Sequence, residues 1–163
     1  MSETITRVMI FSDTHGCLKE IPYLKKIDEY DYFIYLGDGY EEVKNWAKKN
    51  NLNDKFIAVS GNCDYDPDLP RQRFFEIDSV KIFITHGDLY KVKDTYQKIF
   101  EKAKDIGADI AMFGHTHYAD KQNIDGLYLF NPGSIMPRGR DYGSVGYLEI
   151  KNEKILNLEH LTF

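Results

Sequence analysis

Seven residues with metal-ligating side chains each follow a short apolar run in this chain of 163 residues. They are four histidines, two aspartates and one asparagine: Asp13, His15, Asp38, Asn62, His86, His115 and His117. Imidazole nitrogens and carboxylate or carboxamide oxygens are ligands of hard and borderline divalent metals. Each residue alone also has a structural explanation, because Asp caps helices and Asp or Asn beside Gly forms turns. Together they predict an assembled metal site.

The pair His115 and His117 is the most specific part of this pattern. The two imidazoles are one residue apart and follow the apolar run 109–113. Such spacing seldom serves packing, and histidine is the commonest metal ligand among side chains. The remaining histidine, His160, lies in no such motif and is predicted to be structural.

The elements that position these residues are predicted from hydrophobic periodicity. Short apolar, β-branched segments bounded by turns are typical of strands. The expected strands are Arg7–Phe11, Tyr32–Leu36, Phe56–Val59, Phe74–Ile77, Lys81–Thr85, Asp109–Phe113, Ala119–Ile124, Leu127–Phe130, Ser144–Ile150 and Lys154–Leu161. Helical spacing predicts helices over Leu18–Tyr30, Glu41–Lys49 and Tyr90–Lys104, with Gly107 as the stop signal of the last one.

The order of these elements predicts the fold class. Strands and helices alternate in the first part, which favours a parallel sheet with right-handed crossovers, and the second part adds hairpins. We therefore expect an α/β layered sandwich of two mixed β-sheets flanked by helices, formed by a single domain over residues 1–163. Every candidate ligand follows the carboxyl end of a strand, where open α/β sheets place their ligand sites. Five loops far apart in sequence are thus predicted to converge.

Composition limits the partners of such a site. The net charge is −5, and Lys and Arg are scattered, which argues against an extended nucleic acid because backbone phosphates require a basic footprint. A small phosphate ligand stays possible, since bound metals reverse the local sign. Two cysteines form no disulfide framework, and no signal peptide or apolar run of ~20 residues is found. These features predict a soluble cytoplasmic protein without a membrane partner. The sequence leaves open whether the protein forms a homo-oligomer.

The order of the motifs resembles that of the calcineurin-like metallophosphoesterase superfamily. The matching blocks are Asp13-x-His15, Gly37-Asp38, Gly61-Asn62, His86-Gly87 and Gly114-His115-x-His117. The small size, the block Gly61-Asn62-Cys63-Asp64 and the later block Asn131-Pro132-Gly133-Ser134 resemble the compact YfcE-type phosphodiesterases within it.

The resemblance implies a role for each motif residue. It assigns Asp13, His15 and His117 to one metal ion, Asn62, His86 and His115 to a second, and Asp38 to a bridge between them. It also implies a catalytic group of Asn62, Cys63 and Asp64, in which Asp64 orients a ligand. Arg138 and Arg140 closely follow the block 131–134, and their guanidinium groups suit contacts with the phosphate of a substrate. Four imidazoles favour borderline metals, so we expect two divalent ions, Mn²⁺ first, with Fe, Zn²⁺ and Ni²⁺ as alternatives.

The implied reaction is the hydrolysis of a small phosphate ester, most of all a phosphodiester. Two metals clamp the attacking and leaving oxygens and acidify a bridging water, so that a metal-bridging hydroxide attacks phosphorus directly. Two other hydrolase activities stay open, phosphomonoesterase and nucleotide phosphohydrolase. A non-catalytic scaffold, like the retromer subunit Vps29, is the alternative from another class. The complete ligand set favours the enzyme.

Cys63 departs from the family pattern. Many superfamily members carry a histidine directly after the motif asparagine, where it is thought to protonate the leaving group or to hold the phosphate. A thiol is the poorer hydrogen-bond donor. This predicts a preference for esters whose leaving groups need no proton. The alternative is that Cys63 only packs, as free cysteines often do.

Overall fold

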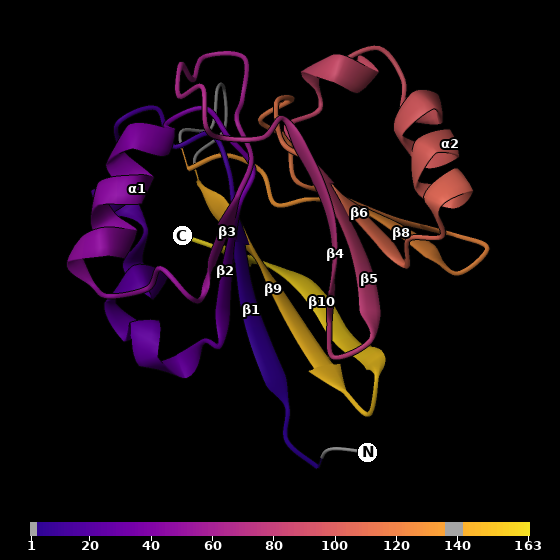
Figure 1. Ribbon diagram of the computed structural model, residues 1–163, viewed down its shortest axis with the longest axis horizontal. Helices are drawn as coiled ribbons and strands as arrows, with labels where there is room; N and C mark the ends of the chain where they lie inside the picture. Colours follow the sequence, from indigo (N-terminus) through magenta and orange to yellow (C-terminus); the bar gives the residue numbers. More distant parts are fainter. Residues whose placement is uncertain (1–2, 136–141) are drawn as a thin grey trace.

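The structure is a computed structural model that describes residues 3–135 and 142–163. Two β-sheets pack face to face, and helices cover both outer surfaces (Figure 1). The strands are β1 (Thr6–Phe11), β2 (Tyr32–Tyr35), β3 (Phe56–Ala58), β4 (Gln72–Ile77), β5 (Val80–Thr85), β6 (Ile110–Met112), β7 (Asp120–Ile124), β8 (Leu127–Asn131), β9 (Ser144–Lys151) and β10 (Lys154–Thr162). One sheet has the order β10-β9-β1-β2-β3 and the other β4-β5-β6-β8-β7. This confirms the predicted layered sandwich.

Both sheets are mixed. In the first sheet β1, β2 and β3 are parallel, while β9 and β10 run antiparallel to their neighbours. In the second sheet β5, β6 and β8 are parallel and β4 and β7 antiparallel. Parallel neighbours require a crossover, and the helices α1 (Tyr40–Lys49) and α2 (Gln97–Ile106) lie in two of these connections. The connections that follow β1, β2, β3, β5 and β6 gather at the upper end of Figure 1.

Three hydrophobic layers hold the sandwich together. Successive residues of β1 point to opposite faces, so Val8 and Ile10 join the core between the sheets, whereas Met9 and Phe11 face the layer beneath α1. All four side chains are fully buried. A third cluster, which includes Ile99 of α2, lies on the outer face of the second sheet. Full burial of a side chain of this size stabilises the fold by about 1.5–3 kcal/mol.

The predicted helix Leu18–Tyr30 is wrong in type. The segment forms two 3₁₀ helices, η1 (Leu18–Glu20) and η2 (Pro22–Glu29). Ile21 between them is extended, with φ −83° and ψ 106°, because the ring of a following proline disfavours helical backbone. Lys26 also leaves the helical region, with φ −115° and ψ 47°.

The predicted helix Tyr90–Lys104 begins too early. A short 3₁₀ helix, η3 (Asp88–Tyr90), comes first, and Lys91 then adopts a left-handed conformation with φ 51° that no helix can continue. The helix α2 begins only at Gln97. Its stop signal is confirmed, because Gly107 is the C-cap with φ 78°.

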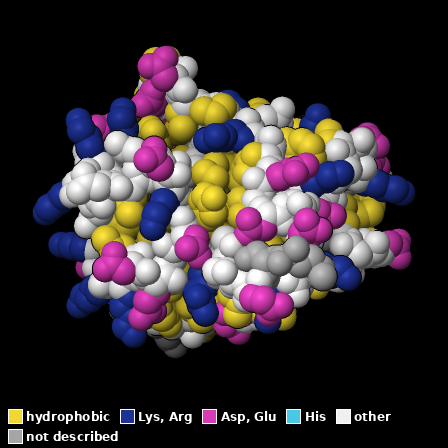
Figure 2. Space-filling model, turned by 60° about the horizontal axis from the view of Figure 1, so that its bottom comes forward, with side chains coloured by type: hydrophobic (Ala, Val, Ile, Leu, Met, Phe, Trp, Pro, Cys, Tyr) yellow, Lys and Arg dark blue, Asp and Glu magenta, His cyan; other side chains and the backbone are white. Residues whose placement is uncertain are grey.

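Figure 2 shows the end of the molecule where the chain begins. Lys and Arg side chains are interspersed there with Asp and Glu around a group of hydrophobic side chains. Histidine is not seen among the described residues of this view. None of the helices in residues 3–135 and 142–163 is long and apolar enough to cross a membrane.

Candidate dinuclear metal centre

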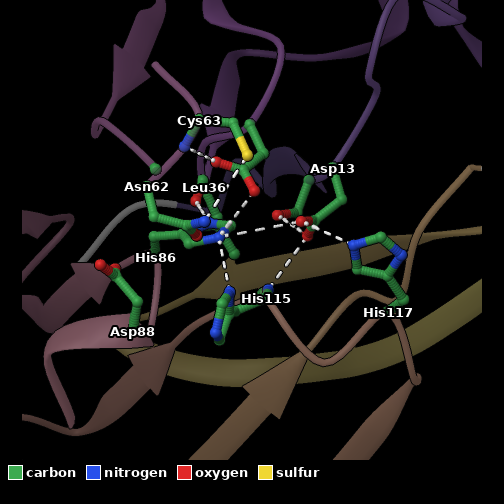
Figure 3. A network of polar contacts seen from close by, with 12 residues as sticks. Asp13, Leu36, Asn62, Cys63, His86, Asp88, His115 and His117 are labelled. Atoms are coloured by element: carbon green, nitrogen blue, oxygen red, sulfur yellow. Dashed lines mark hydrogen bonds and ion pairs between the residues drawn. The ribbon is translucent and has the colours of Figure 1, made fainter. Parts of the chain in front are cut away.

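Six of the seven predicted ligands form two adjoining groups at the convergence of the loops (Figure 3). One group is Asp13, His15 and His117, and the other is Asp38, His86 and His115. Within each group the ligand atoms lie within 4.8 Å of one another. The first group contains the three residues expected at one metal ion. The second group contains His86 and His115 as expected, with Asp38 beside them.

Both aspartates reach across the boundary between the groups. Asp38 Oδ2 lies 3.2 Å from His86 Nε2 in its own group and 3.9 Å from His15 Nε2 in the other. Asp13 Oδ1 lies 3.3 Å from His117 Nε2 and 3.9 Å from His86 Nε2. Each carboxylate therefore lies within 4 Å of histidines from both groups.

The backbone of the ligand loops is unusual. Five of the ligands have positive φ values: Asp13 56°, His15 42°, Asp38 65°, His115 70° and His117 64°. Non-glycine residues rarely adopt this region, and each such residue costs on the order of 1–3 kcal/mol unless its surroundings hold it there. Strain of this kind gathers at functional sites. The sharp turns let each loop direct its ligand back over the strand end toward the other loops.

Neighbouring polar groups orient the ligand atoms. His86 Nδ1 lies 2.7 Å from the carbonyl oxygen of Leu36, to which it can donate, and this orients the ring with Nε2 toward Asp38. Asp13 Oδ2 accepts hydrogen bonds from Ser12 Oγ at 2.5 Å and from the backbone N–H of His115 at 3.1 Å. These contacts fix the carboxylate plane and direct Oδ1 toward the histidines.

The donor set fits a divalent cation. Asp13 Oδ1 is buried and has no hydrogen-bond partner among the described residues, although buried polar atoms are normally satisfied. It faces imidazole nitrogens of both groups. A cation between these atoms would satisfy the oxygen and the lone pairs together.

The charge states of the candidate ligands follow from burial and from their contacts with one another. Burial disfavours the charged form of Asp13, but contacts with His117 and His15 outweigh it and hold the pKa of Asp13 well below its ordinary value. Burial also opposes ionisation of Asp38, and the contact with His86 again prevails, so the pKa of Asp38 is lowered. Burial and the charge of His86 lower the pKa of His115. The contact with Asp13 raises the pKa of His15, and for His86 burial is outweighed by the contact with Asp38, which raises the pKa of that imidazole. The site thus offers ionised carboxylates, and a metal ion would have to displace protons from these two imidazoles.

The residues 62–64 lie beside these groups in different roles. Asn62 lines the adjoining cavity, and its Nδ2 is 3.5 Å from Cys63 Sγ. Cys63 is exposed rather than buried. Its backbone N–H donates to Asp38 Oδ1 at 2.8 Å. Burial, then the charge of Asp38, raises the pKa of the Cys63 thiol, which is therefore protonated at neutral pH.

Asp64 makes its contacts with the backbone of the ligand loops. Its carboxylate accepts backbone N–H groups from Asp38 at 2.8 Å, Gly39 at 3.0 Å, Tyr40 at 3.0 Å and Gly61 at 2.9 Å. These bonds join the loops after β2 and β3 and reach the start of α1. With its oxygens occupied in this way, Asp64 positions the loop of Asp38 rather than acting on a substrate.

The other predicted residues have separate outcomes. Arg138 and Arg140 lie outside the described residues. The block after β8 does border the site, because Ser134 Oγ donates to the carbonyl oxygen of Asp13 at 3.0 Å. His160 stacks on Phe130 with ring centroids 4.6 Å apart, away from the two groups, as expected of a structural histidine.

Asp88 was missed by the sequence analysis. It lies near His115 in Figure 3 and forms an ion pair with Arg71. Its Oδ1 atom is buried and has no hydrogen-bond partner in the described part of the chain. Its position two residues after His86 could have indicated that Asp88 lies close to the ligand groups.

Comparison with known proteins assigns the family. Residues 6–153 match the model of the calcineurin-like phosphoesterase superfamily domain. The chain is 34% identical to the Bacillus subtilis protein named "Probable metallophosphoesterase YsnB", over 90% of this chain and 85% of that one. It is 27% identical to phosphodiesterase YfcE of Escherichia coli, over 88% and 87%. A predicted phosphoesterase of Streptococcus pneumoniae superposes with a TM-score of 0.79 at 25% identity, over 99% of this chain and 91% of that one. With a match that spans most of its length, this chain belongs to the calcineurin-like phosphoesterase superfamily.

Proposed function

We propose that this protein is a phosphodiesterase that uses two divalent metal ions, Mn²⁺ first among the candidates. The observation that carries the proposal is the complete ligand set, with Asp38 in reach of histidines from both groups. Fe, Zn²⁺ and Ni²⁺ suit the same imidazole-rich set. The relative YfcE, named a phosphodiesterase, supports the diester as substrate.

The ions would supply activation of water and neutralisation of the charge that develops on the phosphoryl oxygens. Asp13, His15 and His117 would hold one ion, and Asn62, His86 and His115 the other. Asp38 would connect them. The exposed Cys63 thiol, protonated at neutral pH, would face the ester as a weak hydrogen-bond donor. Hydrolysis would then be a single in-line displacement by water-derived hydroxide, with no covalent enzyme intermediate.

Stereochemistry at phosphorus tests this proposal. With Mn²⁺ present, we expect hydrolysis of an aryl phosphodiester with inversion of a chiral phosphorothioate centre and one solvent ¹⁸O in the product. Retention would mean a covalent intermediate and would contradict direct displacement. Hydrolysis of monoesters or nucleotides alone would favour the other two hydrolase activities. Failure to bind metal or to hydrolyse any ester would favour a scaffold.

Cys63→His tests the role of the thiol. An imidazole at this position is a stronger donor than the thiol, so we expect the variant to gain most on esters with poorly leaving alkoxides, by about tenfold or more. The measurement is log kcat/KM against leaving-group pKa for a series of aryl and alkyl diesters. Cys63→Ser is the matched control, since it changes the donor atom without adding a base. An unchanged slope in Cys63→His would exclude a role in acid catalysis.

A further inference from the structure

A cavity of about 740 Å³ adjoins the two ligand groups. His15, His115 and His117 line it on the side of the proposed metal centre. Its other sides are formed by the segment Val92–Tyr96 and by Tyr118. Small-molecule sites have volumes of about 300–1,000 Å³, far more than a phosphate group alone occupies. The cavity therefore has room for an organic substituent of the ester.

The segment Val92–Tyr96 is held in place beside the metal ligands. Val92 is buried, at 3% exposure, and its N–H donates to the carbonyl oxygen of Gly87, the residue after His86, at 3.4 Å. The N–H groups of Asp94 and Thr95 both donate to the Lys91 carbonyl oxygen, at 3.0 and 3.3 Å. These hydrogen bonds fix the backbone before and after Lys93, which lines the cavity.

Lys93 is the single Lys or Arg among the described residues that line this cavity. Lys93 and the candidate ligand His115 line the same cavity. A cation beside the ligand groups can bind an anionic phosphoryl oxygen that the metals leave exposed.

Tyr118 adds a planar apolar surface. It follows His117 directly, and its N–H donates to Thr116 Oγ1 at 3.1 Å, which ties its backbone to the ligand loop. Its side chain is 50% exposed although it is large and aromatic. Tyr96, which also lines the cavity, is held by an edge-on contact with Phe113, with ring centroids 4.9 Å apart. Aromatic surfaces of this kind favour planar groups, on which they stack.

We propose that Lys93 and Tyr118 form the substrate-binding wall of this cavity, and that the substrate is a phosphoester with a planar aromatic arm, aryl or nucleobase. Lys93 binds a phosphoryl oxygen and Tyr118 packs against the arm. This inference rests on the proposed function, because it places the phosphoryl group on the metal centre. It goes beyond that function by naming the class of arm and two residues that select it.

Binding of two phosphonates to the Mn²⁺-loaded protein tests the inference without requiring turnover. Phenylphosphonate and methylphosphonate share the phosphoryl group and differ only in the arm. By isothermal titration calorimetry, we expect the wild-type protein to bind phenylphosphonate about tenfold more tightly. Tyr118→Ala should abolish this ratio, and Tyr118→Phe should retain it, because the ring and not the hydroxyl makes the contact.

Lys93→Met should weaken the binding of both phosphonates by about tenfold, and Lys93→Arg should restore it. Lys98→Met, an exposed lysine of α2 outside the cavity lining, is the matched control and should bind like wild type. The inference is overturned if the phenyl preference survives Tyr118→Ala, if Lys93→Met leaves both affinities unchanged, or if neither phosphonate binds. Hydrolysis of diesters is measured separately and tests the proposed function. Failure of the binding wall can therefore be distinguished from failure of the phosphodiesterase activity.

Discussion

Replacement of Asp38 by asparagine is expected to lower kcat/KM for an aryl phosphodiester on the order of a hundred- to a thousandfold. The variant loses the negative charge that faces His86 at 3.2 Å and His15 at 3.9 Å, and with it the proposed link between the metal ions. Asparagine tolerates the left-handed backbone of this position, φ 65°, and its carbonyl oxygen can still accept the N–H of Cys63. The fold should therefore persist while the metal content falls below two ions per chain.

The matched control is Asp125→Asn. Asp125 carries the same side chain in the same left-handed conformation, φ 53°, but lies in the turn between β7 and β8, away from the ligand groups. It should keep wild-type activity and metal content. Plasma emission spectrometry for bound metal and a thermal melt accompany the kinetics. An Asp38→Asn protein that retains two ions and full activity would contradict the bridging role.

The strands could be predicted because their patterns are local. Ten apolar or alternating runs correspond to the ten strands, and the Asp-Gly pair at Asp125 and Gly126 does form the turn between β7 and β8. The type of helix could not be predicted from the sequence in the same way. Leu18 and Ile21, whose spacing predicted a helix, are buried at 7% and 2% exposure. Periodicity does not report the constraint that Pro22 puts on the preceding residue.

The convergence of the candidate ligands could be predicted from topology, because parallel strands bring their carboxyl ends to one edge of the sheet. The wall of the adjoining cavity could not. Lys93 and Tyr118 have no motif of their own, and the segment that carries Lys93 was assigned to a helix. Only the left-handed Lys91, which ends η3, turns this segment into a loop over the site. The individual partners of Asp64 could not be predicted either, because they are backbone N–H groups, which no side-chain pattern reveals.

Replacement of Gly114 by alanine is expected to disable the metal centre through packing alone. A Cβ atom at this position would overlap Ser12 Oγ and lie 2.6 Å from Asp13 Oδ2. The backbone there is fixed on both sides, because Gly114 N–H donates to the His86 carbonyl oxygen at 2.9 Å and Asn131 Nδ2 donates to the Gly114 carbonyl oxygen at 3.1 Å. The overlap must therefore be relieved by moving Asp13, which directs its other oxygen toward the histidines.

Overpacking of this kind costs about 1–3 kcal/mol of folding free energy. We expect the melting temperature of Gly114→Ala to fall by several degrees, as about 1 kcal/mol lowers it by 2–4 °C in a chain of this size. Metal titration should show the group of Asp13, His15 and His117 weakened most, because it contains the displaced carboxylate. Gly107→Ala separates steric overlap from backbone strain: its φ is 78°, yet a Cβ there meets no atom within 4 Å. It should lose stability but bind both metals. If Gly114→Ala also binds two ions as tightly as wild type, the close packing of Gly114 does not position Asp13.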